Sequence, residues 1–341
     1  PEKGTGPLNA KGPVPFSGPG LRIAAILKGG PADQRGLNLK PGDVVLAIDG
    51  TEITDKIDLA TLLNDKVNEM IGLTVTSNPI DPRSKRRVEI LGIPRQSTTG
   101  ISSAGLMYER WAAANTKRVH ELSKGTLGYI HIPNMQEPGL DRFLRLLYSD
   151  NFDKDGIVLD VRFNGGGFTH ESILNYLLGK EHTLFSQRDG SQGFVLNFGD
   201  RKWTRPLVCL MNNRSYSDAE IFPHAFRAHG LGKLVGQATG GHVIGTREIQ
   251  LIDGSTFRIP RVGVRTIKGV NMEKEGVIPD VAVEVHPDAL ARGEDAQLEK
   301  AVEILMHDVE LWRKARNHLA GQPRTETQGS SSIGPPPRRD N

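Results

Sequence analysis

The sequence has one cysteine, no long apolar run and little net charge, and each shortage argues against a class of protein. Its single cysteine, Cys209, cannot form an internal disulfide, which excludes a disulfide scaffold. No segment approaches the ~18 consecutive apolar residues that a membrane span requires. The 43 basic and 40 acidic residues leave a formal charge of only +3. No basic and aromatic pattern favours nucleic-acid binding, and no His/Cys cluster has metal-ligand spacing.

What is present is the composition of a globular chain of 341 residues, with 37% apolar and 24% charged residues. That length predicts two or three domains. Glycine and proline dominate residues 1–20, which we expect to be a flexible linker. The sequence begins at Pro1 and not at Met, so it suits a processed product or an excised fragment. The tail at 319–341, rich in Ser and Pro, is expected to be disordered.

Two patterned regions lie between these ends, joined by a helical connector over residues 99–124. In residues 21–98, β-type runs at 21–27 and 44–50 alternate with turns, and a helical pattern covers about 57–70. In residues 125–318, apolar runs typical of buried strands alternate with helical patterns, which predicts an α/β core. The strands are expected at 127–132, 156–161, 206–211 and 233–235, and the helices at about 139–149, 169–179, 217–229 and 295–318.

The first patterned region carries Gly30-Pro31-Ala32, followed by Lys40-Pro41-Gly42-Asp43 and a strand that ends at Asp49-Gly50. This pattern resembles the PDZ domain of bacterial processing proteases. The resemblance implies a β-rich domain that binds a peptide as an added strand. Pro19 removes an amide donor from the loop that would hold the peptide carboxylate. A rigid spacer that keeps the PDZ shape without the binding is therefore an equal alternative.

Two turns in the second region are candidates for chemistry. A glycine cluster at 160–168 follows a buried strand and precedes a helix, where free amides can hold a phosphate or an oxyanion. Its spacing is not that of a nucleotide-binding loop. The turn at 212–220 places Ser215 and Ser217 before another helix, where Glu220 suits a capping arrangement. Both turns can be purely structural.

The order, context and separation of these turns resemble the S41 serine peptidases, and within them the tricorn-type proteases. The matching segments are Lys124 to Pro133, Asp160 to Phe168, Ser217-Asp218, Leu231 to Gly236, Leu251 to Gly254 and Gly276 to Asp280. The resemblance implies a crotonase/ClpP-like peptidase core after the PDZ-like domain, and thus an α/β (α+β) two-domain protein. It also implies a serine endopeptidase that acts on peptides or unfolded polypeptides without metal or organic cofactor.

The resemblance also assigns roles to individual residues. Ser217 matches the nucleophile, and the amides of Gly167 and Asp218 match the two donors of the oxyanion hole. Glu273, three residues before Gly276, matches the glutamate that orients the charge relay. Glu275 is the alternative, and both glutamates can instead be a solvated pair.

Two departures from the family concern the base and the specificity. The family's catalytic histidine lies before the PDZ domain, whereas residues 1–20 contain no histidine. The base is therefore expected either in a missing N-terminal part or at His242, which stands 25 residues after Ser217, where the carboxy-terminal processing branch has its lysine. An imidazole pKa of about 6.5 suits that role.

His131 and His170 are assigned to packing or to the surface. Phe185, 18 residues after Gly167, falls where tricorn has an acidic residue, which predicts an apolar P1 pocket.

The family precedent further suggests a homo-oligomer, and the single free thiol favours a cytoplasmic location. We expect peptide substrates as partners, and neither nucleic acid nor a membrane. The alternative to a protease is a catalytically silent PDZ/S41 scaffold that binds peptides or partner proteins.

Overall fold

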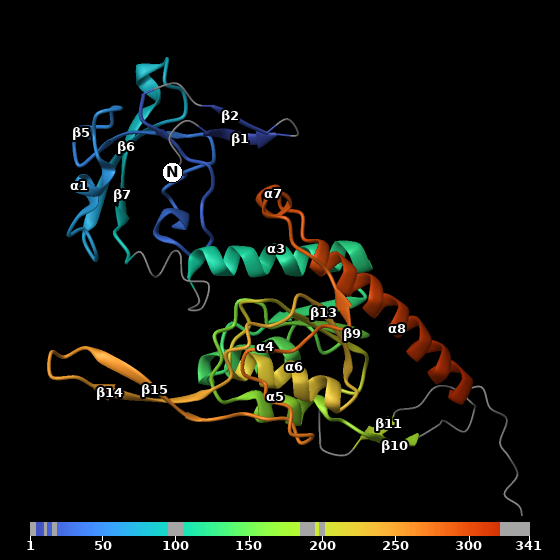
Figure 1. Ribbon diagram of the computed structural model, residues 1–341. Helices are drawn as coiled ribbons and strands as arrows, with labels where there is room; N and C mark the ends of the chain where they lie inside the picture. Colours follow the sequence, from blue (N-terminus) through green and yellow to red (C-terminus); the bar gives the residue numbers. More distant parts are fainter. Residues whose placement is uncertain are drawn as a thin grey trace, which may run out of the picture.

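A computed structural model describes residues 5–9, 12–15, 19–94, 105–184, 195–197 and 202–320. A small β-rich body is followed along the chain by a larger α/β body, and α3 (Leu106–Ser123) lies along the side of the larger body that faces the smaller one (Figure 1). Within the described residues, no helix is long and apolar enough to cross a membrane.

The small body is an antiparallel sheet with strand order β3, β4, β6, β7, and β5 pairs with β4 outside that path. Its core consists of apolar side chains from these strands, among them Leu21, Val45, Leu73 and Val75. Alternate residues of a strand point to the same face, so one face of the sheet is apolar. The strands are β3 (Leu21–Arg22), β4 (Val44–Ile48), β5 (Thr51–Glu52), β6 (Met70–Thr76) and β7 (Lys85–Leu91).

Two predicted elements of this body are shorter than the sequence suggested. The helix expected over 57–70 is only α1 (Leu59–Leu63), which Asp58 caps by accepting from the Ala60 N–H. Asp65 and Asn68 have φ of 59° and 67°, a left-handed conformation that a right-handed helix cannot contain. The strand expected over 21–27 is likewise only β3, because Ile23 bonds the loop at 42–43 instead of a strand.

The expected linker at 1–20 contains secondary structure, so that prediction was wrong for part of its length. Strands β1 (Thr5–Asn9) and β2 (Gly12–Pro15) pair antiparallel. The fixed φ of proline is compatible with an extended edge strand. A high proline and glycine content therefore did not exclude a short two-stranded ribbon.

The larger body contains a parallel five-stranded sheet of order β16, β13, β12, β9, β8. Every residue of the three strands β8, β9 and β12 is buried, as expected for a parallel sheet covered on both faces. The strands are β8 (Leu127–His131), β9 (Gly156–Asp160), β12 (Leu207–Met211), β13 (Gly232–Gly236) and β16 (Val281–Ala282).

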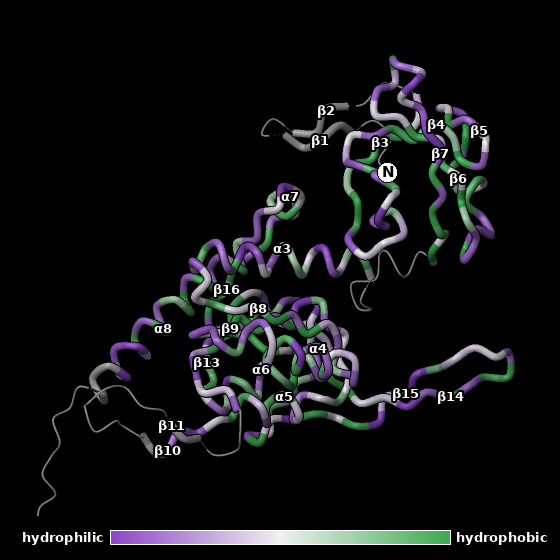
Figure 2. The backbone as a smooth tube through the Cα atoms, turned by 180° about the vertical axis from the view of Figure 1, so that it is seen from behind, coloured by the Kyte–Doolittle hydropathy of each residue, from purple (hydrophilic) through white to green (hydrophobic). Residues whose placement is uncertain are grey.

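Helices cover both faces of this sheet. The residues Leu207, Cys209 and Met211 pack on one face with α4 (Glu137–Tyr148), α5 (His170–Leu177) and α6 (Asp218–Ala228). Their neighbours along the same strand, Val208 and Leu210, pack on the other face with α3 and α8 (Ala296–Ala320). The hydrophobic residues accordingly lie in the central strands, while the outer end of α8 is hydrophilic (Figure 2). The predicted strands and helices of the α/β region are thus present, with ends shifted by a few residues.

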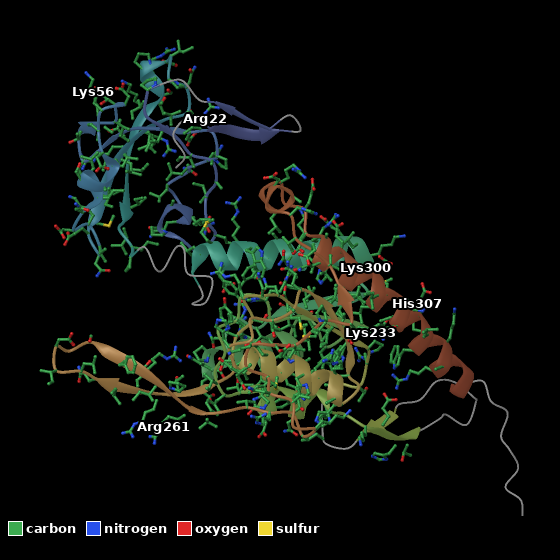
Figure 3. The ribbon with its side chains drawn as sticks, in the orientation of Figure 1. Arg22, Lys56, Lys233, Arg261, Lys300 and His307 are labelled. Carbon is green, nitrogen blue, oxygen red and sulfur yellow. The ribbon has the colours of Figure 1, made fainter. Side chains whose placement is uncertain are left out.

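The sequence pattern did not predict the short strands and the short helix that lie outside the five-stranded sheet. The hairpin of β14 (Gly245–Gln250) and β15 (Thr256–Val262) projects away from the sheet, and Arg261 extends from it into solvent (Figure 3). The segment predicted to match the family at 251–254 forms the tip of this hairpin. The other such elements are β10 (Glu181–Leu184), β11 (Val195–Asn197) and α7 (Pro287–Ala291).

Helix α8 provides a matched test of the packing. Leu305 is fully buried against the sheet, whereas Leu311, on the same helix, is 51% exposed. We expect Leu305→Ala to lower the free energy of unfolding by about 2–5 kcal/mol, because it leaves a cavity in a close-packed core. Leu311→Ala should change it by less than about 0.5 kcal/mol. Urea unfolding of both variants checks this, and equal effects would contradict the described burial.

Candidate active site

Ser217 lies at a sharp turn between the central strand and a helix. Strand β12 ends at Met211, α6 begins at Asp218, and Ser217 between them has φ 56° and ψ −121°. A non-glycine residue in such a conformation is strained by about 1–3 kcal/mol, which persists only where the surroundings enforce it. The residue is only half-buried. A strained strand-to-helix turn of this kind presents a serine hydroxyl above the end of a sheet.

The glycine loop after β9 reaches this serine because β9 and β12 are parallel neighbours. Tyr216 donates its N–H to the carbonyl of Asn164 at 2.9 Å, which joins the two turns directly. A Cβ on Gly166 would lie 2.7 Å from Ser217 Cβ, and one on Gly167 would lie 1.7 Å from the carbonyl oxygen of Met135. A side chain at Gly166 would therefore push the glycine loop away from the Ser217 turn, and one at Gly167 would push it away from the segment at Met135.

The amides predicted to stabilise an oxyanion lie at this junction. The Ser217 carbonyl accepts from the N–H groups of Glu220 and Ile221, so it points into the helix. The N–H of the same peptide, which belongs to Asp218, points the opposite way. Over the part of the chain that is described, neither this amide nor that of Gly167 donates a hydrogen bond to the protein. Neither amide is therefore occupied by a described protein acceptor, which a donor to an oxyanion requires.

A buried ion pair holds the start of the glycine loop, at the end of β9. Asp160 and Arg162 are 0% and 2% exposed and form a salt bridge of 2.8 Å. Tyr129 donates to the Asp160 carboxylate, and Arg162 also pairs with Asp295 just before α8. Burial raises the pKa of Asp160, but the charge and hydrogen bonds of Arg162, together with His131, hold that pKa below its usual value. The pair therefore stays charged and fixes the start of the loop to two other elements.

Comparison with known proteins agrees with this geometry. The model of the family described as "Peptidase family S41" matches residues 126–283, which include both turns, and that of the PDZ domain matches residues 22–75. The chain therefore contains a peptidase S41 domain at residues 126–283. Its S41 domain therefore contains the Ser217 turn and the glycine loop, and the body of β3 to β7 contains the PDZ domain.

The similar proteins are tricorn proteases. The chain is 36% identical over 211 residues to tricorn protease of Thermoplasma acidophilum, which covers 61% of the chain and 19% of that protein. It is 35% identical over 279 residues to a tricorn protease homolog of Saccharolobus solfataricus, covering 81% of the chain and 24% of the homolog. A crystal structure of the tricorn protease aligns with a TM-score of 0.69 at 29% identity, over 84% of this chain and 28% of that one. The chain thus spans a quarter or less of the length of these two relatives.

Glu273 of the S41 domain is held close to the Ser217 turn, whereas Glu275 is not. Its Oε2 accepts from the N–H groups of Val243 and Ile244 at 2.8 and 2.9 Å. These residues follow His242, whose carbonyl accepts from the Ser217 N–H at 3.0 Å. Glu273 is half-buried, while Glu275 is exposed and lines a groove under α6.

The backbone of His242 is next to Ser217, but its ring points elsewhere. Its Nδ1 donates to the carbonyl of Gly240 at 2.7 Å, and its ring lies 5.0 Å from that of Tyr216. No hydrogen bond joins any described histidine ring to Ser217. In a neutral ring, a proton on Nδ1 leaves Nε2 as the acceptor. His242 would need a side-chain rotation to act on the serine.

Three candidate residues remain. One lies outside the described residues, and the other two are histidines with partners inside the S41 domain. Phe185, predicted to line the P1 pocket, lies outside the described residues. His131 is buried and bonded to Tyr108 and to the carbonyl of Arg162, as the packing assignment expected. His170, assigned to packing or the surface, places Nδ1 2.5 Å from Oδ1 of Asp218. Sequence spacing gave no signal for this contact, because 48 residues separate the partners.

The pair of His170 and Asp218 predicts a dependence of stability on pH. The hydrogen bond to the Asp218 carboxylate raises the pKa of His170 above its ordinary value, despite partial burial. The stabilisation is therefore complete below the ordinary pKa of about 6.5 and is lost as pH rises through the raised value. We expect His170→Gln to lower the melting temperature at pH 5–6 more than at pH 9.

His182 provides the matched control, because it is exposed and its ring bonds only its neighbour Thr183 among the described residues. Melting temperatures of wild type, His170→Gln and His182→Gln at several pH values measure the difference. A His170→Gln deficit that stays constant from pH 5 to pH 9 would rule out the charged pair.

Proposed function

We propose that this chain carries the nucleophile of a tricorn-type serine endopeptidase that acts on peptides or unfolded polypeptides. The observation that carries the proposal is Ser217, strained and half-exposed beside the glycine loop and the open amide of Asp218. The similarity to tricorn proteases supports it. Because the chain spans a quarter or less of those relatives, the activity of the whole protein belongs to the proposal.

The proposed reaction is acyl transfer through Ser217. Its Oγ attacks the peptide carbonyl carbon while its proton passes to a general base, and the carbonyl oxygen becomes an oxyanion bound by the amides of Gly167 and Asp218. The tetrahedral intermediate collapses, and the base returns the proton to the leaving amine. Water then hydrolyses the ester by the same steps. Removing one oxyanion donor typically costs about 10²- to 10³-fold in rate.

No described residue is hydrogen-bonded to Ser217 as a general base would be. We place the base in a region that precedes the PDZ domain in the longer protein, with Glu273 orienting it from the S41 domain. His242 is the alternative, since its backbone carbonyl accepts from the Ser217 N–H and its Nδ1 is already bonded to the Gly240 carbonyl, which makes Nε2 the ring nitrogen that could act on the serine. Phe185 remains our candidate for an apolar P1 pocket.

The remaining parts of the proposal concern architecture. We assign the S41 domain to the crotonase/ClpP-like class. We divide the chain into a PDZ domain at 21–98, a connector at 99–124 and a core at 125–318. We propose a homo-oligomer in the cytoplasm; the buried Cys209, whose thiol pKa is raised by burial, is compatible with a reducing compartment.

A silent scaffold is the second candidate function, because no described base is hydrogen-bonded to Ser217. In that case the PDZ domain and the S41 domain would bind peptides without cleaving them. The two candidates differ in whether Ser217 can be acylated.

Reaction with a fluorophosphonate, followed by intact mass, tests the nucleophile. We expect an adduct on the wild type, or on the protein extended at its N-terminus, that disappears in Ser217→Ala. The exposed Ser255 provides the matched control, because Ser255→Ala should label like the wild type. An adduct lost in His242→Ala would place the base within the chain. Absence of labelling from both the chain and the extended protein would favour the scaffold.

The two glutamates near Gly276 make a second test. Glu273 is held against the loop at 243–244, so Glu273→Gln should slow labelling of Ser217 by at least about tenfold, since general acid–base groups contribute about 10²- to 10⁴-fold. Glu275→Gln removes the same charge from an exposed position and should leave the rate unchanged. The rate of fluorophosphonate labelling is measured for both variants. If Glu275→Gln slowed labelling and Glu273→Gln did not, the orienting role would belong to Glu275.

A further inference from the structure

Glu220 is a fully buried carboxylate directly behind the candidate nucleophile. It is the third residue of α6, and its side chain is 0% exposed. The sequence suggested only a helix cap at this position. In the structure the carboxylate accepts four hydrogen bonds, two on each oxygen. The donors are the N–H of Ser217 (3.1 Å) and of His242 (2.7 Å) on Oε1, and the hydroxyl of Thr239 (2.5 Å) and the N–H of Gly241 (2.7 Å) on Oε2.

All four partners of Glu220 are donors, which is the hydrogen bonding of an ionised carboxylate. Backbone N–H groups can only donate. The Thr239 hydroxyl accepts from the N–H of Val277 at 2.7 Å and donates its own proton to Glu220. No ion pair with a basic side chain is found for Glu220 in the described part of the chain. The hydrogen bonds and the positive end of α6 therefore stabilise its charge.

Two glutamates together hold one loop against the serine turn. Glu220 binds the N–H groups of Gly241 and His242, and Glu273 binds those of the next two residues, 243 and 244. Four consecutive amides are thus held by two carboxylates. Through Thr239 and Val277, Glu220 is also connected to the segment that carries Glu273.

Glu220 also fixes both peptide groups of Ser217. Its carboxylate accepts from the Ser217 N–H, and its own N–H donates to the Ser217 carbonyl at 2.8 Å. The second of these peptides ends in the N–H of Asp218. The main-chain N–H groups of Glu220 and Ile221 hold that second peptide, which the proposed function uses for the oxyanion, while the Glu220 carboxylate holds the peptide before it.

We infer that Glu220 is a positioning residue for acyl transfer, which locks the strained backbone of Ser217 and aligns the Asp218 amide with the loop at 239–244. The inference rests on the proposed function for its effect on rate. Its structural part, the clamp between the turn and the loop, stands by itself.

Glu220→Gln is the sharpest variant, because it keeps the shape and turns one acceptor oxygen into an NH2 donor that faces two other donors. Glu137→Gln is the matched control: it removes the same charge from the first turn of α4, where the side chain is exposed. Thr239→Val removes two bonds on the loop side, the one from the Thr239 hydroxyl to Glu220 and the one from the Val277 N–H to that hydroxyl. It serves as the second variant if Glu220→Gln does not fold.

Three measurements test the inference on the full chain or on its N-terminally extended form. They are the rate of fluorophosphonate labelling, the ³¹P chemical shift of the Ser217 adduct, and amide hydrogen exchange by mass spectrometry. We expect Glu220→Gln to slow labelling about 10- to 100-fold, approaching the loss of an oxyanion donor. The ³¹P shift should move, because the phosphoryl oxygen loses a hydrogen bond. Exchange should accelerate at 239–244 and stay unchanged in β9.

Each outcome decides one of the two proposals. Labelling of Glu220→Gln at the rate of Glu137→Gln, with an unchanged ³¹P shift, would overturn the positioning role. Slower labelling with an unmoved ³¹P shift would mean a general loss of stability and would overturn it too. If wild type is not labelled in either form, the proposed function fails, and exchange alone decides the clamp: faster exchange at 239–244 supports it, and unchanged exchange rejects it.

Discussion

The parallel pairing of β9 and β12 is the constraint on which the rest of the site depends. Adjacent parallel strands end at the same edge of a sheet, so the loop after β9 and the turn after β12 must meet there. Apolar side chains on both faces of the sheet fix these strands, and the pair of Asp160 and Arg162 anchors the loop at its start. The strained conformation of Ser217 persists because this frame enforces it.

Backbone amides and carboxylates build the site more than long polar side chains do. The open amides lie on the glycine loop and at the start of α6, while Glu220 and Glu273 hold the facing loop through its own amides. Such bonds leave little freedom to either partner, since each carboxylate oxygen that holds the loop accepts from backbone N–H groups fixed by the loop itself. The side chains with more freedom, such as that of His242, point away from the serine.

The sequence predicted the buried strands and helices of the S41 domain better than the short helix α1 and the exposed hairpin of β14 and β15. The buried strands and most helices of the S41 domain follow from long apolar runs and helical periodicity, which packing reinforces. The helix at 57–70 was overestimated because its apolar spacing continued past Asn64, where left-handed Asp65 and Asn68 end it. The hairpin of β14 and β15 escaped notice because both its faces are largely exposed, so its residues show no simple apolar alternation.

The sequence by itself determined which residue types stand at the ends of the strands. It pointed to Ser217, Gly167, Asp218 and Glu273, because short-range patterns and family motifs consist of residues that are neighbours along the chain. Only the tertiary structure decided that Glu220 bonds the loop at 239–242 and that His170 pairs with Asp218. These partners lie between 19 and 48 residues apart. Their contacts arise from the packing of α5 and α6 on one sheet face, which no local pattern encodes.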